Sequence, residues 1–256
     1  MHVSVIGHSD SIGLKLEPGE DSWPVLLGKM LSEELNEPVP VDSWRFAAYG
    51  PHAVPWAIGK VTAAQPDVVV IMVSSYWCAF GRVSNKVRQR FGQRAERWYL
   101  RAEDGFVKHA EREHGTGKPT NTRTRRFMRR VVGVSAYAGL EEVTDVFTTV
   151  VRKLAQLEHL QVILVSDHHF TEAVRQANAG ILPTLAHFEA VIRPIANEHR
   201  FLWLDIEDAL KEGGRREEMV LGDGVHLTAE AHARVAAMLM PVVRRIGQAG
   251  ELSTQR

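Results

Sequence analysis

Short apolar runs alternate with longer amphipathic segments along most of this chain. The runs that we expect to form buried parallel strands are Val3–Ile6, Val68–Val73, Val162–Val165 and Phe201–Leu204, with a weaker one near Val39–Phe46. Helical periodicity covers about Ser22–Asn36, Val54–Ala64, Leu140–Leu157, Pro183–His199 and Thr228–Ile246. This alternation predicts a single α/β domain over residues 1–256. We expect a three-layer α/β/α sandwich around a five-stranded parallel sheet of flavodoxin-like order.

The segment from about residue 79 to residue 138 departs from this alternation. Gln89–His114 has helical character, whereas His114–Thr124 is rich in Gly, Thr, Pro and Asn and is typical of a loop. Residues 82–130 hold 15 Lys or Arg against five Asp or Glu, although the whole chain has a net charge of zero. We expect a basic, helical insertion that forms a lid over the carboxyl ends of the strands. Its charge favours an anionic substrate or partner, and a solvated helical face with Arg–Glu pairs is the alternative.

The bulk composition is that of an ordinary globular protein, with 45% hydrophobic and 24% charged residues. No apolar run approaches the roughly 20 residues of a membrane-spanning helix. The N-terminal residues indicate a strand and not a cleavable leader. The single cysteine, Cys78, excludes an internal disulfide framework. No nucleic-acid-binding motif accompanies the basic segment. We therefore expect a cytoplasmic protein that acts on a small molecule, and the oligomeric state stays open.

Two polar motifs stand near the two ends of the chain. Gly7–Gly13 (GHSDSIG) follows the first strand, and Gly222–Leu227 (GDGVHL) precedes the last helix. Parallel sheets bind their ligands beyond the carboxyl ends of the strands, where we expect Ser9 to lie. A serine hydroxyl becomes a nucleophile when an imidazole accepts its proton, and a carboxylate can orient that imidazole. Ser9, His226 and Asp223 are therefore candidates for a nucleophilic triad.

In order and spacing these motifs resemble the SGNH (GDSL-type) hydrolase family. That family begins with a Gly-Asp-Ser block, which has a further glycine four residues after the serine, and it ends with an Asp-x-x-His block. The first block falls on Gly7–Gly13 and the last on Asp223 and His226. The resemblance implies that Ser9 is the nucleophile, His226 the general base and Asp223 the residue that orients the imidazole. Ser11 is a competing hydroxyl, but its spacing to the glycines does not match.

The resemblance also implies an oxyanion hole with three hydrogen-bond donors. The backbone N–H of Ser9 and that of Gly50, after the second strand, are two of them. The third is an Asn after the third strand in the family, and Tyr76 stands at that position here. Three alternatives are open: Tyr76 donates through its phenol, a neighbouring serine replaces it, or Tyr76 and Trp77 form a pocket wall.

A second departure is His8, which replaces the acid of the family's first block. It could form an ion pair with Asp10, contact the substrate, or take over the structural role of the acid that it replaces. The pair His168 and His169 follows the fourth strand at the same end of the sheet and either contacts substrate or belongs to a polar loop. The candidates for substrate contacts are His8, Ser74, Ser75, Trp77, His168 and His169.

A metal site is a further alternative, because His and Asp side chains gather near the strand ends. These are His8, Asp10, Asp167, His168, His169, Asp223 and His226. Mixed His and carboxylate ligands can hold a divalent ion. Since no spacing matches a known metal motif, we expect neither a metal nor another cofactor.

Together these features predict a serine hydrolase of esterase or thioesterase type that forms an acyl-enzyme on Ser9. Members of the family cleave esters and thioesters or transfer acyl groups. The expected substrate is a small ester, thioester or other acyl compound, and the basic insertion suggests that it is anionic or bound to a phosphopantetheine-bearing carrier. Two alternatives stay open: an acyltransferase with the same triad, and a catalytically divergent binding or biosynthetic protein. His8 and Tyr76 favour the latter.

Overall fold

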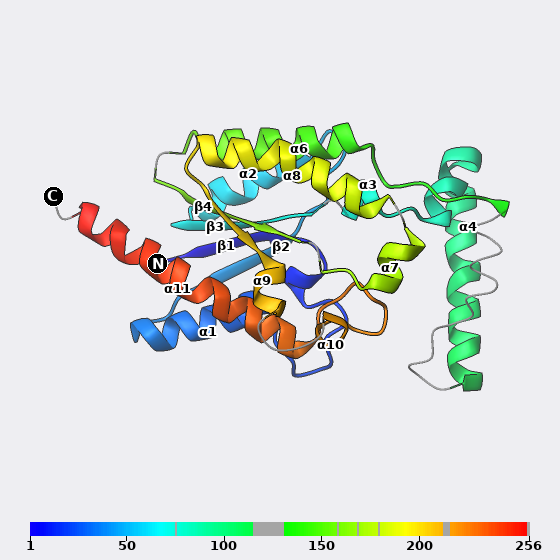
Figure 1. Ribbon diagram of the computed structural model, residues 1–256, viewed down its shortest axis with the longest axis horizontal. Coiled ribbons are helices and arrows are strands. Elements are labelled where there is room, and N and C mark those ends of the chain that lie inside the picture. The colour runs from blue at the N-terminus through cyan, green and yellow to red at the C-terminus, as the bar shows by residue number, and fades with distance from the viewer. Residues whose placement is uncertain are drawn as a thin grey trace.

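A five-stranded, fully parallel sheet forms the centre of the molecule (Figure 1). The computed structural model describes residues 1–74, 76–114, 131–157, 159–167, 169–178, 180–211 and 216–254. The strands are β1 (Val3–Gly7), β2 (Val41–Arg45), β3 (Val68–Val73), β4 (Gln161–Ser166) and β5 (Leu202–Asp205). Their order is β2-β1-β3-β4-β5, and every neighbouring pair is parallel. The predicted five-stranded sheet of flavodoxin-like order is confirmed.

The inner strands are apolar because they are covered on both faces. Every residue of β1 and β3 is buried, and so is β4 after its first residue. In register, Val5 lies beside Val70, and Val70 lies beside Ile163. The edge strands β2 and β5 are mostly half-buried, which explains why β2 gave the weakest signal in the sequence. The continuous apolar runs therefore mark the middle of the sheet.

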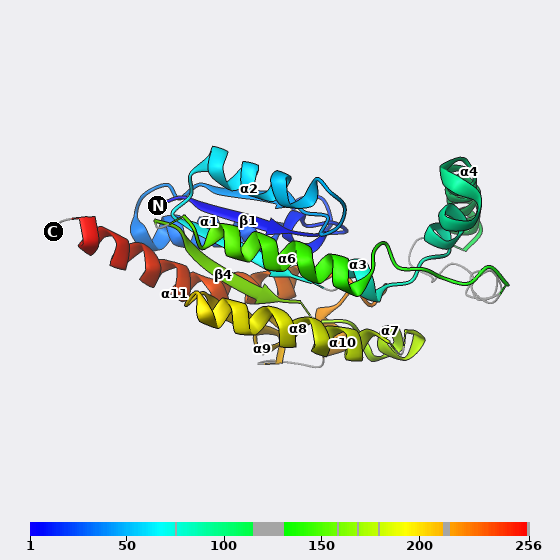
Figure 2. The same cartoon turned by 90° about the horizontal axis from the view of Figure 1, so that it is seen from above.

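Helices cover both faces of the sheet and complete the three layers (Figures 1 and 2). One face is covered by α2 (Ala53–Ala64), α6 (Leu140–Leu154) and α8 (Ile181–Glu198), and the other by α1 (Trp23–Leu35) and α11 (Ala229–Thr254). Each layer has its own apolar core, one around Phe147 and Phe188 and the other around Trp23 and Leu27. The remaining short elements are η1 (Asp10–Ile12), α3 (Tyr76–Ala79), α7 (Glu172–Ala177), α9 (Ile206–Lys211) and α10 (Arg216–Met219).

The predicted insertion contains the long helix α4 (Val83–His114), which stands apart from the sheet beyond the carboxyl ends of the strands (Figures 1 and 2). It begins earlier than the periodicity indicated and is kinked at Gly92, whose φ is 81°. Arg82 and Ser135 form an antiparallel bridge where the insertion leaves and rejoins the body. Residues 115–130, which carry much of the predicted basic lid, lie outside the described residues. The lid therefore stays a prediction.

Candidate active site

Ser9 lies in a tight turn directly after β1. The turn requires glycine at position 7, because a Cβ there would lie 2.7 Å from Ser11 Cβ and 2.8 Å from Met72 Sδ. Gly13 ends the following 3-10 turn in the left-handed region, with φ at 64°. The glycines of the motif thus allow the chain to turn sharply at the carboxyl end of β1. Ser9 itself is half-buried at this position.

Asp223 forms three hydrogen bonds with the segment that carries His226, two of them with His226 itself. Its Oδ2 is 2.6 Å from His226 Nδ1, and its Oδ1 accepts hydrogen bonds from the backbone N–H groups of His226 and Val225 at 3.0 and 2.9 Å. Partial burial by itself raises the pKa of Asp223, but these hydrogen bonds outweigh it and lower the pKa to about 2. Asp223 is therefore a carboxylate at neutral pH. Because Nδ1 of His226 is engaged, Nε2 is the nitrogen that can accept a proton.

The loop that carries His226 is attached to the loop that carries Ser9. The backbone N–H of Leu227 donates to Asp10 Oδ1 at 3.1 Å. Within the described part of the chain, Ser9 and His226 form no hydrogen bond with each other, and Ser9 Oγ instead lies 3.2 Å from His8 Nδ1. Catalytic hydrogen bonds are often long before substrate binds. The structure thus brings the two predicted motifs to one end of the sheet, with an additional histidine at the nucleophile.

His8 belongs to a group of four charged side chains, which we call the buried His–Asp cluster: His8, Asp10, Asp167 and His169. Asp167 pairs through Oδ2 with His8 Nε2 and through Oδ1 with His169 Nδ1. Asp10 Oδ2 lies 3.3 Å from His169 Nε2 and 3.8 Å from His8 Nδ1. One of the three alternatives for His8, an ion pair with Asp10, is thus present, but Asp167 is the nearer partner of His8.

The cluster is charged in spite of its burial. Desolvation on its own lowers the pKa of a histidine and raises that of an aspartate. Attraction and hydrogen bonding within the cluster outweigh desolvation: the pKa of His8 is raised and that of His169 is raised well above its usual value. The pKa of Asp10 is lowered and that of Asp167 is lowered well below its usual value. These directions favour the charged form of all four side chains, with two imidazolium rings facing two carboxylates.

Three residues of this cluster are also candidates for the metal site that the sequence suggested as an alternative. His8, Asp10 and Asp167 each offer one polar atom, and these atoms lie within 4.8 Å of one another, close enough to share a divalent ion. In the structure these groups pair with each other, and both carboxylates also pair with His169. Asp167 is a member of the cluster that the triad motifs did not single out. Its position directly after β4, at the same sheet end as Ser9, is the signal that could have found it.

His169 lies in the irregular segment after β4, where it is fully buried. Besides its pairs with Asp167 and Asp10, its Nε2 lies 2.5 Å from the carbonyl oxygen of Val225. His168 and Ser75, two further candidates for substrate contacts, lie outside the described residues. Ser74 is buried, and its Oγ accepts a hydrogen bond from the backbone N–H of Tyr76 at 3.2 Å.

The two further oxyanion candidates both have partners. The backbone N–H of Gly50 donates to Glu142 Oε1 at 2.9 Å, and its φ of 82° explains why glycine occupies this turn. The phenol of Tyr76 accepts a hydrogen bond from Arg82 Nη2 and keeps its own proton for donation. The Tyr76 ring also packs against Trp77, which is buried.

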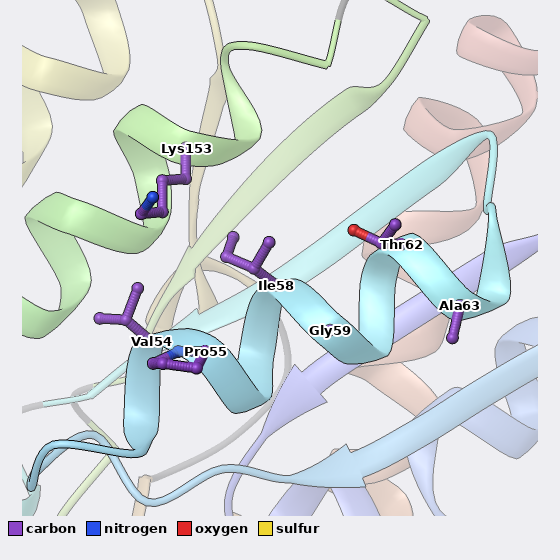
Figure 3. A pocket seen from close by; sticks show the side chains of 7 residues that line it. All are labelled: Val54, Pro55, Ile58, Gly59, Thr62, Ala63 and Lys153. Atoms are coloured by element: carbon purple, nitrogen blue, oxygen red, sulfur yellow. The ribbon is translucent and has the colours of Figure 1, made fainter.

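An open pocket of the structure lies elsewhere, along the outer side of α2 near α6 (Figure 3). It is lined by Val54, Pro55, Ile58, Gly59, Thr62, Ala63 and Lys153. None of these residues is a candidate for catalysis or for the oxyanion hole. Among the helices of the described ranges, none combines the length and the hydropathy that a membrane crossing requires.

Comparison with known proteins gives one family and one fold. Residues 5–234 match the model of the GDSL-like lipase/acylhydrolase family. The solved structure of TesA matches with a TM-score of 0.56 and 14% identity, over 96% of this chain and 99% of that one. Axe2, an acetylxylan esterase from Geobacillus stearothermophilus, matches with a TM-score of 0.54 and 16% identity, over 96% of this chain and 94% of that one. A carbohydrate acetylesterase family member from Sinorhizobium meliloti matches with a TM-score of 0.51 and 18% identity, over 96% of this chain and 99% of that one. At these identities the shared feature is the fold, and no curated relative matches the sequence.

Proposed function

This chain belongs to the GDSL-like lipase/acylhydrolase family, and from that membership we propose that it is a serine hydrolase that cleaves esters through an acyl-enzyme on Ser9. The observation that carries the proposal is the Asp223–His226 pair, with 2.6 Å between Oδ2 and Nδ1. That pair belongs to a loop whose Leu227 N–H is bound to Asp10, the residue after Ser9. A carboxylate, an imidazole and a hydroxyl are the groups that acyl-enzyme chemistry needs.

In the proposed acylation step, Ser9 Oγ bonds to the acyl carbon while its proton moves to His226 Nε2. The carbonyl electron pair moves onto oxygen, and when it returns, the bond to the leaving group breaks and that group takes the proton from His226. Water then attacks the acyl-enzyme, His226 accepts the water's proton, and the same proton returns to Ser9 Oγ as the acid is released. Asp223 stabilises the imidazolium in both half-reactions.

The tetrahedral intermediates require donors directed at the oxyanion. We assign this role to the backbone N–H groups of Ser9 and Gly50, with the Tyr76 hydroxyl as the third donor. Glu142, which now accepts from Gly50, is an exposed carboxylate, and a substrate oxyanion would replace it. Arg82 donates to the phenol oxygen of Tyr76, which leaves the phenol's own proton available for the oxyanion.

For the substrate we propose a small acyl ester or thioester. Two of the neighbours are named as esterases of acetylated carbohydrates, which supports a short acyl group on a polar leaving group. The excess of Lys and Arg in residues 82–130 supports an anionic or carrier-bound substrate. These two features are compatible, because the acyl group and the leaving group are different parts of one substrate.

The experiment is steady-state hydrolysis of p-nitrophenyl esters and acyl-coenzyme A thioesters of increasing chain length. Ser9→Ala should lower kcat by roughly 10⁴-fold or more, whereas Ser11→Ala, which removes the competing hydroxyl, should retain turnover. Circular dichroism of each variant shows whether it is folded. Full activity in folded Ser9→Ala would exclude Ser9 as the nucleophile.

A further inference from the structure

Ser9 Oγ has a hydrogen-bond partner that the triad does not account for. His8 Nδ1 lies 3.2 Å from Ser9 Oγ, although the residue in this position of the family's motif is an acid. On its other side, His8 Nε2 pairs with Asp167, which is 1% exposed. Ser9, His8 and Asp167 thus form a second hydroxyl–imidazole–carboxylate chain on the same oxygen.

The charges around His8 decide the direction of that hydrogen bond. The groups that face the ring are Asp167, Asp10 and His169, together with the Ser9 hydroxyl. Nε2 faces the Asp167 carboxylate, and the negative charge of that group stabilises a proton on this nitrogen. Asp10 Oδ2, 3.8 Å from Nδ1, stabilises a proton there as well. With two carboxylates against two imidazoles, the cluster is neutral only when both rings are protonated. In that protonation state His8 Nδ1 is the donor and Ser9 Oγ the acceptor.

We propose that His8 is a second catalytic imidazole, which stays protonated and donates from Nδ1 to Ser9 Oγ while His226 removes the serine proton. This inference rests on the proposed function, because it assigns a role at the same nucleophile. The His8 proton stays on Nδ1 throughout. It stabilises the negative charge that develops on Oγ during attack, and it stabilises Oγ again as the leaving group when the acyl-enzyme is hydrolysed.

The other two members of the cluster position His226. Asp10 accepts from the backbone N–H of Leu227, and His169 donates to the carbonyl oxygen of Val225. These are the residues on either side of His226. A single charged network therefore holds His8 against Ser9 and holds the loop that presents the general base. Asp10 and His169 act here as positioning residues.

This arrangement has a consequence for the pH dependence of the reaction. Reaction needs the imidazole of His226 free to accept the serine proton, so the rate falls under acid conditions that protonate the base. It also needs His8 protonated, so the rate falls again once pH passes the pKa of His8, which the cluster raises. Two essential groups in opposite protonation states give a bell-shaped profile. A triad without His8 would give the rising limb alone.

The test is the second-order rate constant for phosphonylation of Ser9 by a fluorophosphonate, measured from about pH 5 to about pH 10. Mass mapping confirms the site, and circular dichroism at each pH confirms the fold. The key variant is His8→Asn, which keeps an N–H donor but cannot be charged. The matched control is His187→Asn, which removes an exposed histidine of α8.

We expect a bell-shaped profile for the wild type and for His187→Asn. His8→Asn should lose the alkaline limb and react roughly 10–100-fold more slowly at neutral pH. Asp167→Asn is the second variant: it removes the carboxylate that raises the pKa of His8, so it should move the alkaline limb to lower pH.

Three results would overturn the inference. The first is a folded wild type whose labelling rate does not fall at alkaline pH. The second is a His8→Asn profile that stays bell-shaped. The third is a His8→Asn variant that loses only thermal stability, which would make His8 a structural residue. Absence of labelling at Ser9 in the wild type would instead contradict the proposed function itself, and the role of His8 with it.

Discussion

Replacing Asp167 by Asn removes one of the two carboxylates that balance two buried imidazolium rings. The side chain is 1% exposed and contacts His8 through Oδ2 and His169 through Oδ1. Asn has nearly the same volume, but it carries no charge and can accept through only one atom, so Asp10 alone would face two cations. Breaking a buried ion pair from one side costs about 3–5 kcal/mol. For a domain of this size that is a decrease in Tm of roughly 10 °C.

The assay is urea unfolding at pH 7, with Asp208→Asn as the matched control. Asp208 is 72% exposed and lies 3.5 Å from Lys211 Nζ, so its loss should cost only about 0–1 kcal/mol. The histidines have raised pKa values in the folded state. Their stabilisation is therefore complete below the unfolded pKa of about 6.5 and is lost as pH rises through the folded values. The difference between the wild type and Asp167→Asn should accordingly shrink at alkaline pH.

A cost for Asp167→Asn no larger than that of the exposed control would refute this reasoning. It would mean that the four side chains are not jointly charged in the folded protein. A large cost that does not change at alkaline pH would likewise assign the loss to packing instead of charge.

Three further predictions concern the catalytic loops and the substrate. Asp223→Asn should lower kcat for ester hydrolysis by roughly 10⁴-fold, because His226 Nδ1 loses the carboxylate that fixes its tautomer; a loss confined to KM would contradict that role. Gly7→Ala should destabilise the protein by about 1–3 kcal/mol, since its Cβ would overlap Ser11 and Met72. Gly59→Ala, in open space on α2, should instead be neutral or stabilising in the same thermal melt. Arg82→Gln should raise KM for anionic esters more than for neutral esters, and equal effects on both would argue against an anionic substrate.

Most of the fold could be predicted because it depends on local patterns. The run Val68–Val73 is both the predicted strand and β3 itself, and the strand order follows from the alternation of strands and helices. Boundaries moved by a few residues where tertiary contacts decide them: β2 is shorter than the weak run near Val39–Phe46, and α6 ends at Leu154. Burial against the sheet, and not periodicity alone, sets those limits.

Contacts in the site could be predicted only where both residues of a pair lie in the same short sequence motif. Asp223 and His226 are three residues apart, so their pairing follows from the local turn. The pairing of His8 with Asp167 joins the ends of β1 and β4, which are separated in the sheet by β3. The hydrogen bond from Gly50 to Glu142 also joins distant segments. Such contacts depend on how the elements are arranged in space, and residue types and spacing do not encode them.

Mass-mapped labelling with a fluorophosphonate probe, on the wild type and on His226→Ala, shows whether Ser9 is an activated nucleophile. We expect a single adduct on Ser9 in the wild type and no adduct in folded His226→Ala, because the hydroxyl needs that imidazole to lose its proton. An unlabelled Ser9 in folded wild-type protein, or labelling of Ser11 in its place, would exclude acyl-enzyme chemistry on Ser9.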